Sequence, residues 1–129
     1  ILDLSGFTAF GERLKKELGD REGAAEFANR VNTILSTMVE VVYEFGGDVL
    51  MFAGDALICF FEERADKNTS NSDDTVSMES ATRTRVRDCC LRILGDDRVG
   101  GDRDFTIHGG AAHGLVRSFF LGKSSATPG

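Results

Sequence analysis

The sequence contains no long apolar segment and no excess of basic residues. None of its apolar runs reaches the roughly 18 residues that a membrane-spanning helix requires, and the pattern of a signal peptide is missing. The formal net charge is -6 at pH 7, which argues against binding to a nucleic-acid polymer and leaves no basic face for an anionic membrane. The sequence therefore predicts a cytoplasmic protein, while membrane attachment through segments outside this stretch stays open.

Metal-binding and disulfide patterns are missing as well. The three cysteines, Cys59, Cys89 and Cys90, form neither a CxxC pair nor a regular framework, and their odd number favours a reducing compartment. Because they lie in an apolar run and in an expected helix, we interpret them as small apolar core residues. His108 and His113 flank a glycine-rich turn without a third ligand nearby, so no metal site is expected there.

What is present is enough for one folded domain. Hydrophobic residues make up 41% of the 129 residues, which allows a sizeable core. Ile1 already lies inside an apolar run, so we expect residues 1–129 to be a partial domain, truncated at both ends and cut from a longer protein.

Hydrophobic periodicity and turn residues predict the order of helices and strands. Apolar residues at steps of three and four indicate two helices in the first half, and apolar runs around Gly54-Asp55 indicate a tight hairpin. Ser5 or Thr8 is expected to cap the first helix, and Gly46-Gly47 to end the second. The expected elements are a strand at Ile1–Leu4, a helix up to about Leu18, a helix at Gly23–Phe45, strands at Val49–Phe52 and Ala56–Phe61, a helix at Arg85–Leu94, and a strand, bend and strand within Phe105–Leu121.

The stretch Glu62–Glu79 differs in composition from the rest. It is polar, rich in Ser, Asn and Asp, and almost free of large apolar residues. Such a stretch cannot offset its ordering entropy by burial, so we expect a disordered insertion loop within the domain. The resulting order, β-α-α-β-β-loop-α-β-β, predicts an α+β fold with helices on one face of a sheet.

Two aspartates interrupt apolar runs. Asp3 lies at the end of the first expected strand, and Asp55 lies at the tip of the hairpin. If these strands are neighbours, both carboxylates project at the same edge of the sheet, where they repel each other unless a cation sits between them. Such oxygen ligands suit Mg²⁺ or Mn²⁺, and the helix that opens at Ser5–Thr8 offers an anion site beside them. The alternative is that both aspartates only form turns or cap helices.

These residues also carry a resemblance to a known family. The stretch LDLSGFTAF, followed after a long helix by FGGDVLMFAGDALICFF, resembles the catalytic domain of class III nucleotidyl cyclases. The later GGAAHGLVRSFFLG resembles the strand-turn-strand of that domain, with one extra residue near His113. The likeness is greatest to the first catalytic domain of the bicarbonate-responsive soluble adenylyl cyclases and covers most of the chain outside Glu62–Glu79. It implies a ferredoxin-like fold with a mostly antiparallel sheet.

The resemblance also implies roles for particular residues. Asp3 and Asp55 match the aspartates that hold two metal ions in the family, Mg²⁺ or Mn²⁺, and Leu4 falls within the same metal-binding motif. The metals activate the ribose 3′-hydroxyl of ATP and stabilise charge as it attacks the α-phosphate, which yields 3′,5′-cyclic AMP and pyrophosphate. We expect Phe7 to anchor the core rather than stack on a base. The residues expected to bind the substrate phosphates are Ser5, Gly6, Phe7, Thr8 and Gly54.

The chain departs from the family at the position that recognises the base. In the family, the active site lies between two such domains, and the second domain supplies an adenine-reading lysine together with an asparagine and an arginine. The lysine position, three residues before the hairpin glycine, is Met51 here, and its side chain cannot hydrogen-bond a purine edge. We therefore expect the metal-binding half of a dimeric site, inactive in isolation, whose partner is a second cyclase domain in the same or another chain.

Three alternatives stay open. A non-catalytic regulatory domain that dimerises with an active cyclase domain would account for Met51. A guanylyl cyclase would share the metal chemistry, since the residues that select ATP or GTP are changed or absent. A diguanylate cyclase is suggested by Gly46-Gly47-Asp48, although Val49-Leu50 follows where that family has an acidic residue and then Phe.

Overall fold

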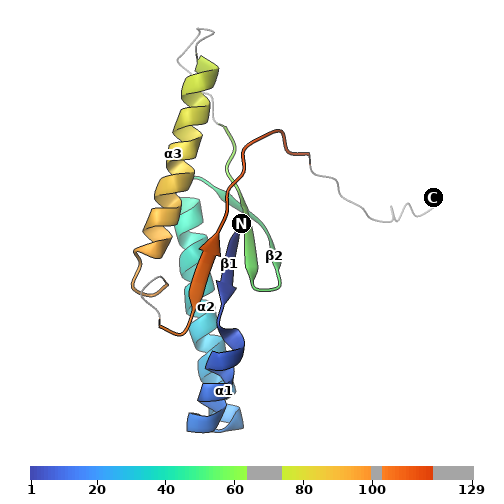
Figure 1. Cartoon of the computed structure of the whole chain (residues 1–129), viewed down its shortest axis with the longest axis vertical. Helices are drawn as coiled ribbons and strands as arrows, with labels where there is room; N and C mark the ends of the chain where they lie inside the picture. The colour runs from blue at the N-terminus through green and yellow to red at the C-terminus, as the bar shows by residue number, and fades with distance from the viewer. Residues whose placement is uncertain (64–73, 100–102, 118–129) are drawn as a thin grey trace, which may run out of the picture.

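Four short strands form one antiparallel sheet (Figure 1). The computed structural model describes residues 1–63, 74–99 and 103–117. In their order across the sheet, the strands are β2 (Asp48–Ala53), β3 (Ala56–Phe60), β1 (Leu2–Ser5) and β4 (Thr106–Gly109). All three pairings are antiparallel, so the expected mostly antiparallel sheet is confirmed. The first strand is the neighbour of the hairpin, as the sequence interpretation required.

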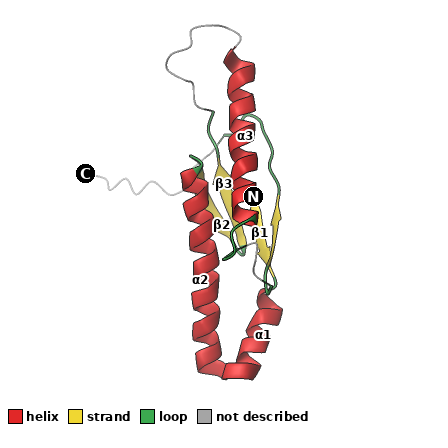
Figure 2. Ribbon diagram, turned by 90° about the vertical axis from the view of Figure 1, so that its left-hand side faces the viewer, coloured by secondary structure: helices red, strands yellow, loops and turns green. Residues whose placement is uncertain are grey.

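Three helices complete this α+β fold, which is consistent with a ferredoxin-like cyclase domain (Figure 2). They are α1 (Phe7–Leu18), α2 (Asp20–Glu44) and α3 (Asp74–Leu94). The predicted break at Gly19 is confirmed, although α2 begins directly after it at Asp20 rather than at Gly23. Gly23 lets α1 and α2 approach closely, because a Cβ atom there would lie 2.8 Å from the carbonyl oxygen of Leu14. No helix in the part of the chain that the structure describes is long and apolar enough to cross a membrane.

The core lies between the helices and one face of the sheet. Leu2, Leu4 and Leu57 are buried there, while Asp3 alternates to the opposite face. The apolar stripe that periodicity predicted for α2 packs against these leucines, together with residues from α3 and from the segment before β4. The buried residues from these parts include Ile34, Met38, Val41, Val42, Ile93 and Phe105. The prediction of helices on one face of the sheet is therefore confirmed.

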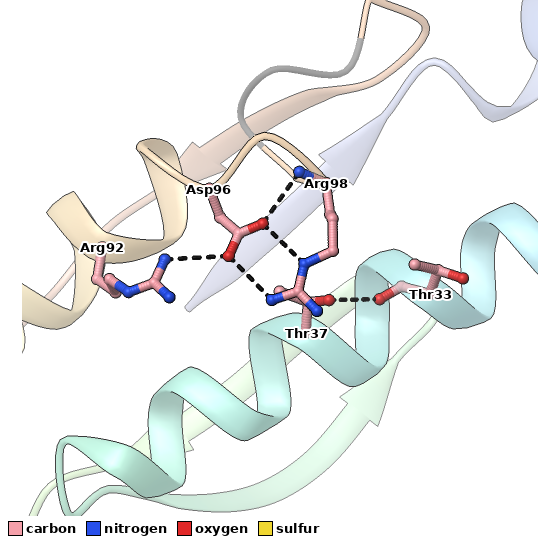
Figure 3. A network of polar contacts seen from close by, with 5 residues as sticks. All are labelled: Thr33, Thr37, Arg92, Asp96 and Arg98. Atoms are coloured by element: carbon pink, nitrogen blue, oxygen red, sulfur yellow. Dashed lines mark hydrogen bonds and ion pairs between the residues drawn. The ribbon is translucent and has the colours of Figure 1, made fainter.

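A buried carboxylate just after α3 binds two arginines (Figure 3). Asp96 is only 7% exposed and accepts hydrogen bonds from the Arg98 backbone N–H at 3.0 Å, from the Arg98 guanidinium at 3.0 and 3.1 Å, and from Arg92 at 3.0 Å. The bonds from Arg98 above all hold the pKa of Asp96 well below its usual range. Figure 3 shows this network next to α2, in which the Thr37 hydroxyl donates its own hydrogen bond to the Thr33 carbonyl oxygen at 2.8 Å.

Helix α3 is longer than the sequence predicted. It begins at Asp74 rather than at Arg85, so the end of the expected loop Glu62–Glu79 is helical, while residues 64–73 of that loop lie outside the described residues. The first turns are polar and form an ion pair between Glu79 and Arg83, four residues apart. Ion pairs between residues four apart stabilise a helix on its surface. The later turns of α3 pack on the domain, and the helix extends from them into this polar stretch. Composition alone does not reveal this extension.

The last strand is shorter than predicted. Strand β4 ends at Gly109, residues 110–117 form no strand, and residues 118–121 of the expected second strand lie outside the described residues. The ladder with β1 runs from Ser5 opposite Thr106 to Leu2 opposite Gly109. One further backbone bond follows, from Gly110 N–H to the Ile1 carbonyl oxygen at 3.0 Å.

Candidate functional site

Asp3 lies in the middle of the sheet. It is the second residue of β1, which continues to Ser5 rather than ending near Asp3 as predicted. It sits opposite Ala56 on one side and His108 on the other, and it is half-buried. No hydrogen bond or ion pair to its carboxylate is formed within residues 1–63, 74–99 and 103–117, so this acidic group is available to a ligand.

Asp55 projects from the turn between β2 and β3. Ala53 pairs with Ala56, so Gly54 and Asp55 are the two turn residues that the sequence predicted. Gly54 has φ of +66° and no other residue of the described chain has positive φ in this turn, which is the pattern of a type II′ hairpin. The Asp55 side chain is exposed and, among the described residues, has no hydrogen-bond partner.

The backbone brings the two aspartates to neighbouring positions. The Leu4 N–H donates to the Asp55 carbonyl oxygen at 3.2 Å, one register step beyond the pair of Asp3 with Ala56. Asp3 in β1 and Asp55 in the neighbouring hairpin turn are thus adjacent along the backbone pairing. Two neighbouring carboxylates with no partner among the described residues offer oxygen ligands to a bound cation.

The donor set fits a hard cation whose shell is completed by other oxygens. Within the described residues, no group of three His, Cys, Asp or Glu side chains is placed to hold a metal ion. Asp3 and Asp55 would therefore supply two carboxylates, with phosphate oxygens and water as the remaining ligands, as is usual for Mg²⁺. The side chain of Leu4 is fully buried and contains no ligand atom. Any ligand from this residue therefore has to be its backbone carbonyl oxygen.

The segment that leads from β1 into α1 is held in an unusual conformation. Gly6 is the N-cap residue of α1, with φ of +110°, and no side chain caps this helix. The prediction that Ser5 or Thr8 is the cap is therefore wrong. The Ser5 hydroxyl instead donates to the Thr106 carbonyl at 3.3 Å, and Thr8 lies inside the first turn. The first N–H groups of α1 receive no side-chain cap, which is the condition for an anion site.

Phe7 is half-buried and belongs to an aromatic cluster beside the core. Its ring centroid lies 5.4 Å from that of Phe105 and 6.0 Å from that of Phe27. Phe10 contacts the same two rings at 4.8 and 5.7 Å. These contacts bear out the interpretation of Phe7 as a core anchor, and they fix the start of α1 beside β1.

Met51 lies on the same face of the sheet as Asp3. It sits opposite Ile58 in β3, and Ile58 is two residues from Ala56, which sits opposite Asp3. Met51 is 55% exposed, and the strand carries a bulge between Val49 and Met51 that sequence reasoning did not predict. The site therefore presents an apolar side chain to solvent beside two carboxylates.

Sequence reasoning left one neighbour of the site without a role. His108 sits directly opposite Asp3 across the β1–β4 pairing and is exposed. Nothing in the local sequence indicates this placement, because it depends on the register between two strands that are about a hundred residues apart.

Comparisons with known proteins indicate the class to which such a domain is related. No family model matches the chain, and no solved structure matches it. Curated relatives do match over about half of the chain, and the likeness supports a domain related to adenylyl cyclases. Adenylate cyclase type 10 of Rattus norvegicus is 41% identical over 62 residues, which are 48% of this chain and 4% of that protein. Adenylate cyclase type 10 of Homo sapiens is 42% identical over 61 residues, or 47% of this chain and 4% of that protein. The matched stretch thus spans a small fraction of these relatives.

Proposed function

We propose that this domain is the metal-binding half of an adenylyl cyclase active site. In this proposal, it converts ATP to 3′,5′-cyclic AMP and pyrophosphate at an interface with a second cyclase domain. The observation that carries it is the position of Asp3 in β1 beside Asp55 in the neighbouring hairpin turn, joined by the bond from Leu4 N–H to the Asp55 carbonyl. The likeness to adenylate cyclase type 10 supports the same reaction class.

Each residue of the site has a physical role in this proposal. The carboxylates of Asp3 and Asp55 hold two Mg²⁺ or Mn²⁺ ions, which supply Lewis-acid activation of the ribose 3′-hydroxyl and the α-phosphate. The uncapped N–H groups at the start of α1, around Gly6 to Thr8, orient the terminal phosphates through hydrogen bonds and the helix dipole. Gly54 leaves the turn open, since no atom lies within 4 Å of the place where a Cβ would be.

The base has to be recognised by another domain. Met51 offers only a weak thioether acceptor, and neither of its strand neighbours Leu50 and Phe52 carries a side-chain hydrogen-bonding group. The partner is therefore a second cyclase domain with a polar residue at the position of Met51. In a dimer of two copies of this domain, both would carry carboxylates and neither would read the base.

The proposal is tested in the full-length protein with the variants Asp3→Asn and Asp55→Asn. Both side chains lack partners among the described residues, so the exchange removes charge without breaking a contact. Each variant is expected to lose nearly all Mn²⁺-dependent cyclic AMP synthesis while its thermal midpoint stays unchanged. Asp20→Asn is the control, because Asp20 is an exposed carboxylate at the first residue of α2, far from the site in sequence and paired only with Lys15 at 3.0 Å. Normal synthesis by either site variant would refute the two-metal assignment.

A non-catalytic regulatory domain is the second candidate, and Met51 is the observation that favours it. The two candidates differ in what the carboxylates do. When this domain is mixed with a complementary cyclase domain that reads the base, a catalytic half gives activity that depends on Asp3, whereas a regulatory domain changes the partner's activity in the same way with Asp3→Asn.

A further inference from the structure

Arg85 occupies the root of the hairpin that carries Asp55. It lies in α3 and is partly buried. Its Nη2 donates to the Glu62 carbonyl oxygen at 2.7 Å and to Thr82 Oγ1 at 3.2 Å, and its Nη1 donates to the Gly46 carbonyl oxygen at 3.5 Å. Gly46 precedes β2 and Glu62 follows β3, so one guanidinium joins both ends of the hairpin to α3.

The backbone around this guanidinium is tightly packed. A Cβ atom on Gly47 would lie 2.6 Å from the ring of Phe61, so the two strand roots are in direct contact. Helix α2 ends there in a Schellman motif, in which Gly46 N–H bonds to Tyr43 and Gly47 N–H to Val42, both at 2.9 Å. The negative end of the α2 dipole favours a cation at this point.

The tip of the hairpin is bound to β1, but its root is not. Strand β2 is an edge strand, and β3 pairs with β1 only at Leu57 and Ala56. The direction in which the hairpin leaves the domain therefore depends on how its root is fixed. Bonds from a charged donor are stronger than those from a neutral one, so the guanidinium holds both carbonyl oxygens more firmly than a neutral side chain would.

We propose that Arg85 is a positioning residue, which fixes the hairpin root and so, together with the bond from Leu4 N–H at the tip, keeps Asp55 beside Asp3. Its effect on metal binding rests on the function proposed above, whereas its effect on the hairpin does not. Arg85 touches neither metal nor nucleotide in this assignment, and it acts through the backbone of Gly46 and Glu62.

The test compares three variants of the full-length protein. Arg85→Met removes the donors and keeps the apolar stem, Arg85→Lys keeps the charge with a different geometry, and Arg98→Met breaks a comparable guanidinium contact with Asp96 at the far end of α3. Hydrogen exchange of residues 48–60 is expected to be roughly tenfold faster in Arg85→Met, intermediate in Arg85→Lys and unchanged in Arg98→Met. Mn²⁺ affinity is measured by electron paramagnetic resonance of the free ion. It is expected to fall by about tenfold in Arg85→Met, by less in Arg85→Lys and not at all in Arg98→Met.

The outcomes separate this inference from the proposed function. Unchanged exchange of residues 48–60 in Arg85→Met, or equal acceleration in Arg98→Met, overturns the positioning role. If wild type and Asp55→Asn bind Mn²⁺ equally, the proposed function fails, and the exchange result still decides the role of Arg85. If Arg85→Met does not fold, the comparison of Arg85→Lys with wild type decides it in the same way.

Discussion

Replacement of Gly6 by alanine tests the conformation that starts α1. Gly6 has φ of +110°, and a Cβ atom there would overlap the carbonyl oxygen of Asp104. Gly54 provides the matched control, since it has φ of +66° and no atom within 4 Å of its Cβ position. The two substitutions add the same methyl group at positive φ, but only the methyl group at position 6 would clash with backbone atoms.

The structure gives the size of each effect. Left-handed backbone costs an L-residue about 1–2 kcal/mol, which is the whole expected cost of Gly54→Ala. Gly6→Ala adds the displacement of Asp104, and overpacking of this kind costs about 1–3 kcal/mol more. The sum of roughly 2–5 kcal/mol is a large part of the 5–15 kcal/mol that stabilises a typical domain.

Urea unfolding followed by far-ultraviolet circular dichroism measures both costs. Gly6→Ala should lower the midpoint by about 1–2 M and Gly54→Ala by clearly less, with similar slopes. Equal losses in the two variants would refute the reasoning, because they would mean that the segment containing Asp104 moves aside without cost. In the full-length protein, Gly6→Ala should also displace the N–H groups proposed to bind phosphate.

Two further predictions concern ionisable groups. Because Arg98 and Arg92 lower the pKa of Asp96, its ion pairs stabilise the fold above the unfolded carboxyl pKa of about 3.9 and are lost as the pH falls below it toward the folded pKa. The difference in thermal midpoint between wild type and Asp96→Asn should therefore be full at pH 7 and shrink below pH 4, and a constant difference would contradict the assignment. Burial raises the pKa of Cys89 to about 12, so this thiol should resist a disulfide reagent at pH 8 until the protein unfolds. Rapid labelling that Cys89→Ser abolishes would show that the thiol is accessible.

Local signals in the sequence predicted the elements that depend on local physics. The hairpin follows from Gly54 and the apolar runs that flank it, and α2 follows from its apolar stripe and from Gly46, whose positive φ ends the helix. The neighbouring positions of Asp3 and Asp55 followed from assuming that the first strand pairs with the hairpin, which the structure bears out. Metal binding by the pair stays a prediction.

Features that depend on distant partners were not predictable in this way. The start of α3 at Asp74 has no apolar periodicity to reveal it, and the end of β4 at Gly109 depends on its pairing with the distant strand β1. The Ser5 hydroxyl was expected to cap α1, but a carbonyl of β4 takes its hydrogen bond. The role proposed for Arg85 depends on carbonyl groups on either side of the hairpin, which no motif records.

The central place of β1 has a consequence for how the domain is made. Strand β1 precedes both of its sheet neighbours in the chain, and its bond from Ser5 to Thr106 closes a separation of 101 residues. Closing so long a loop is entropically costly and slows folding relative to local contacts. Helices and the hairpin can form during synthesis, but β1 stays unpaired on one side until β4 has been translated. Asp3 therefore reaches its final surroundings last, so a chain that stops before β4 would carry the acidic residues of the site without its geometry.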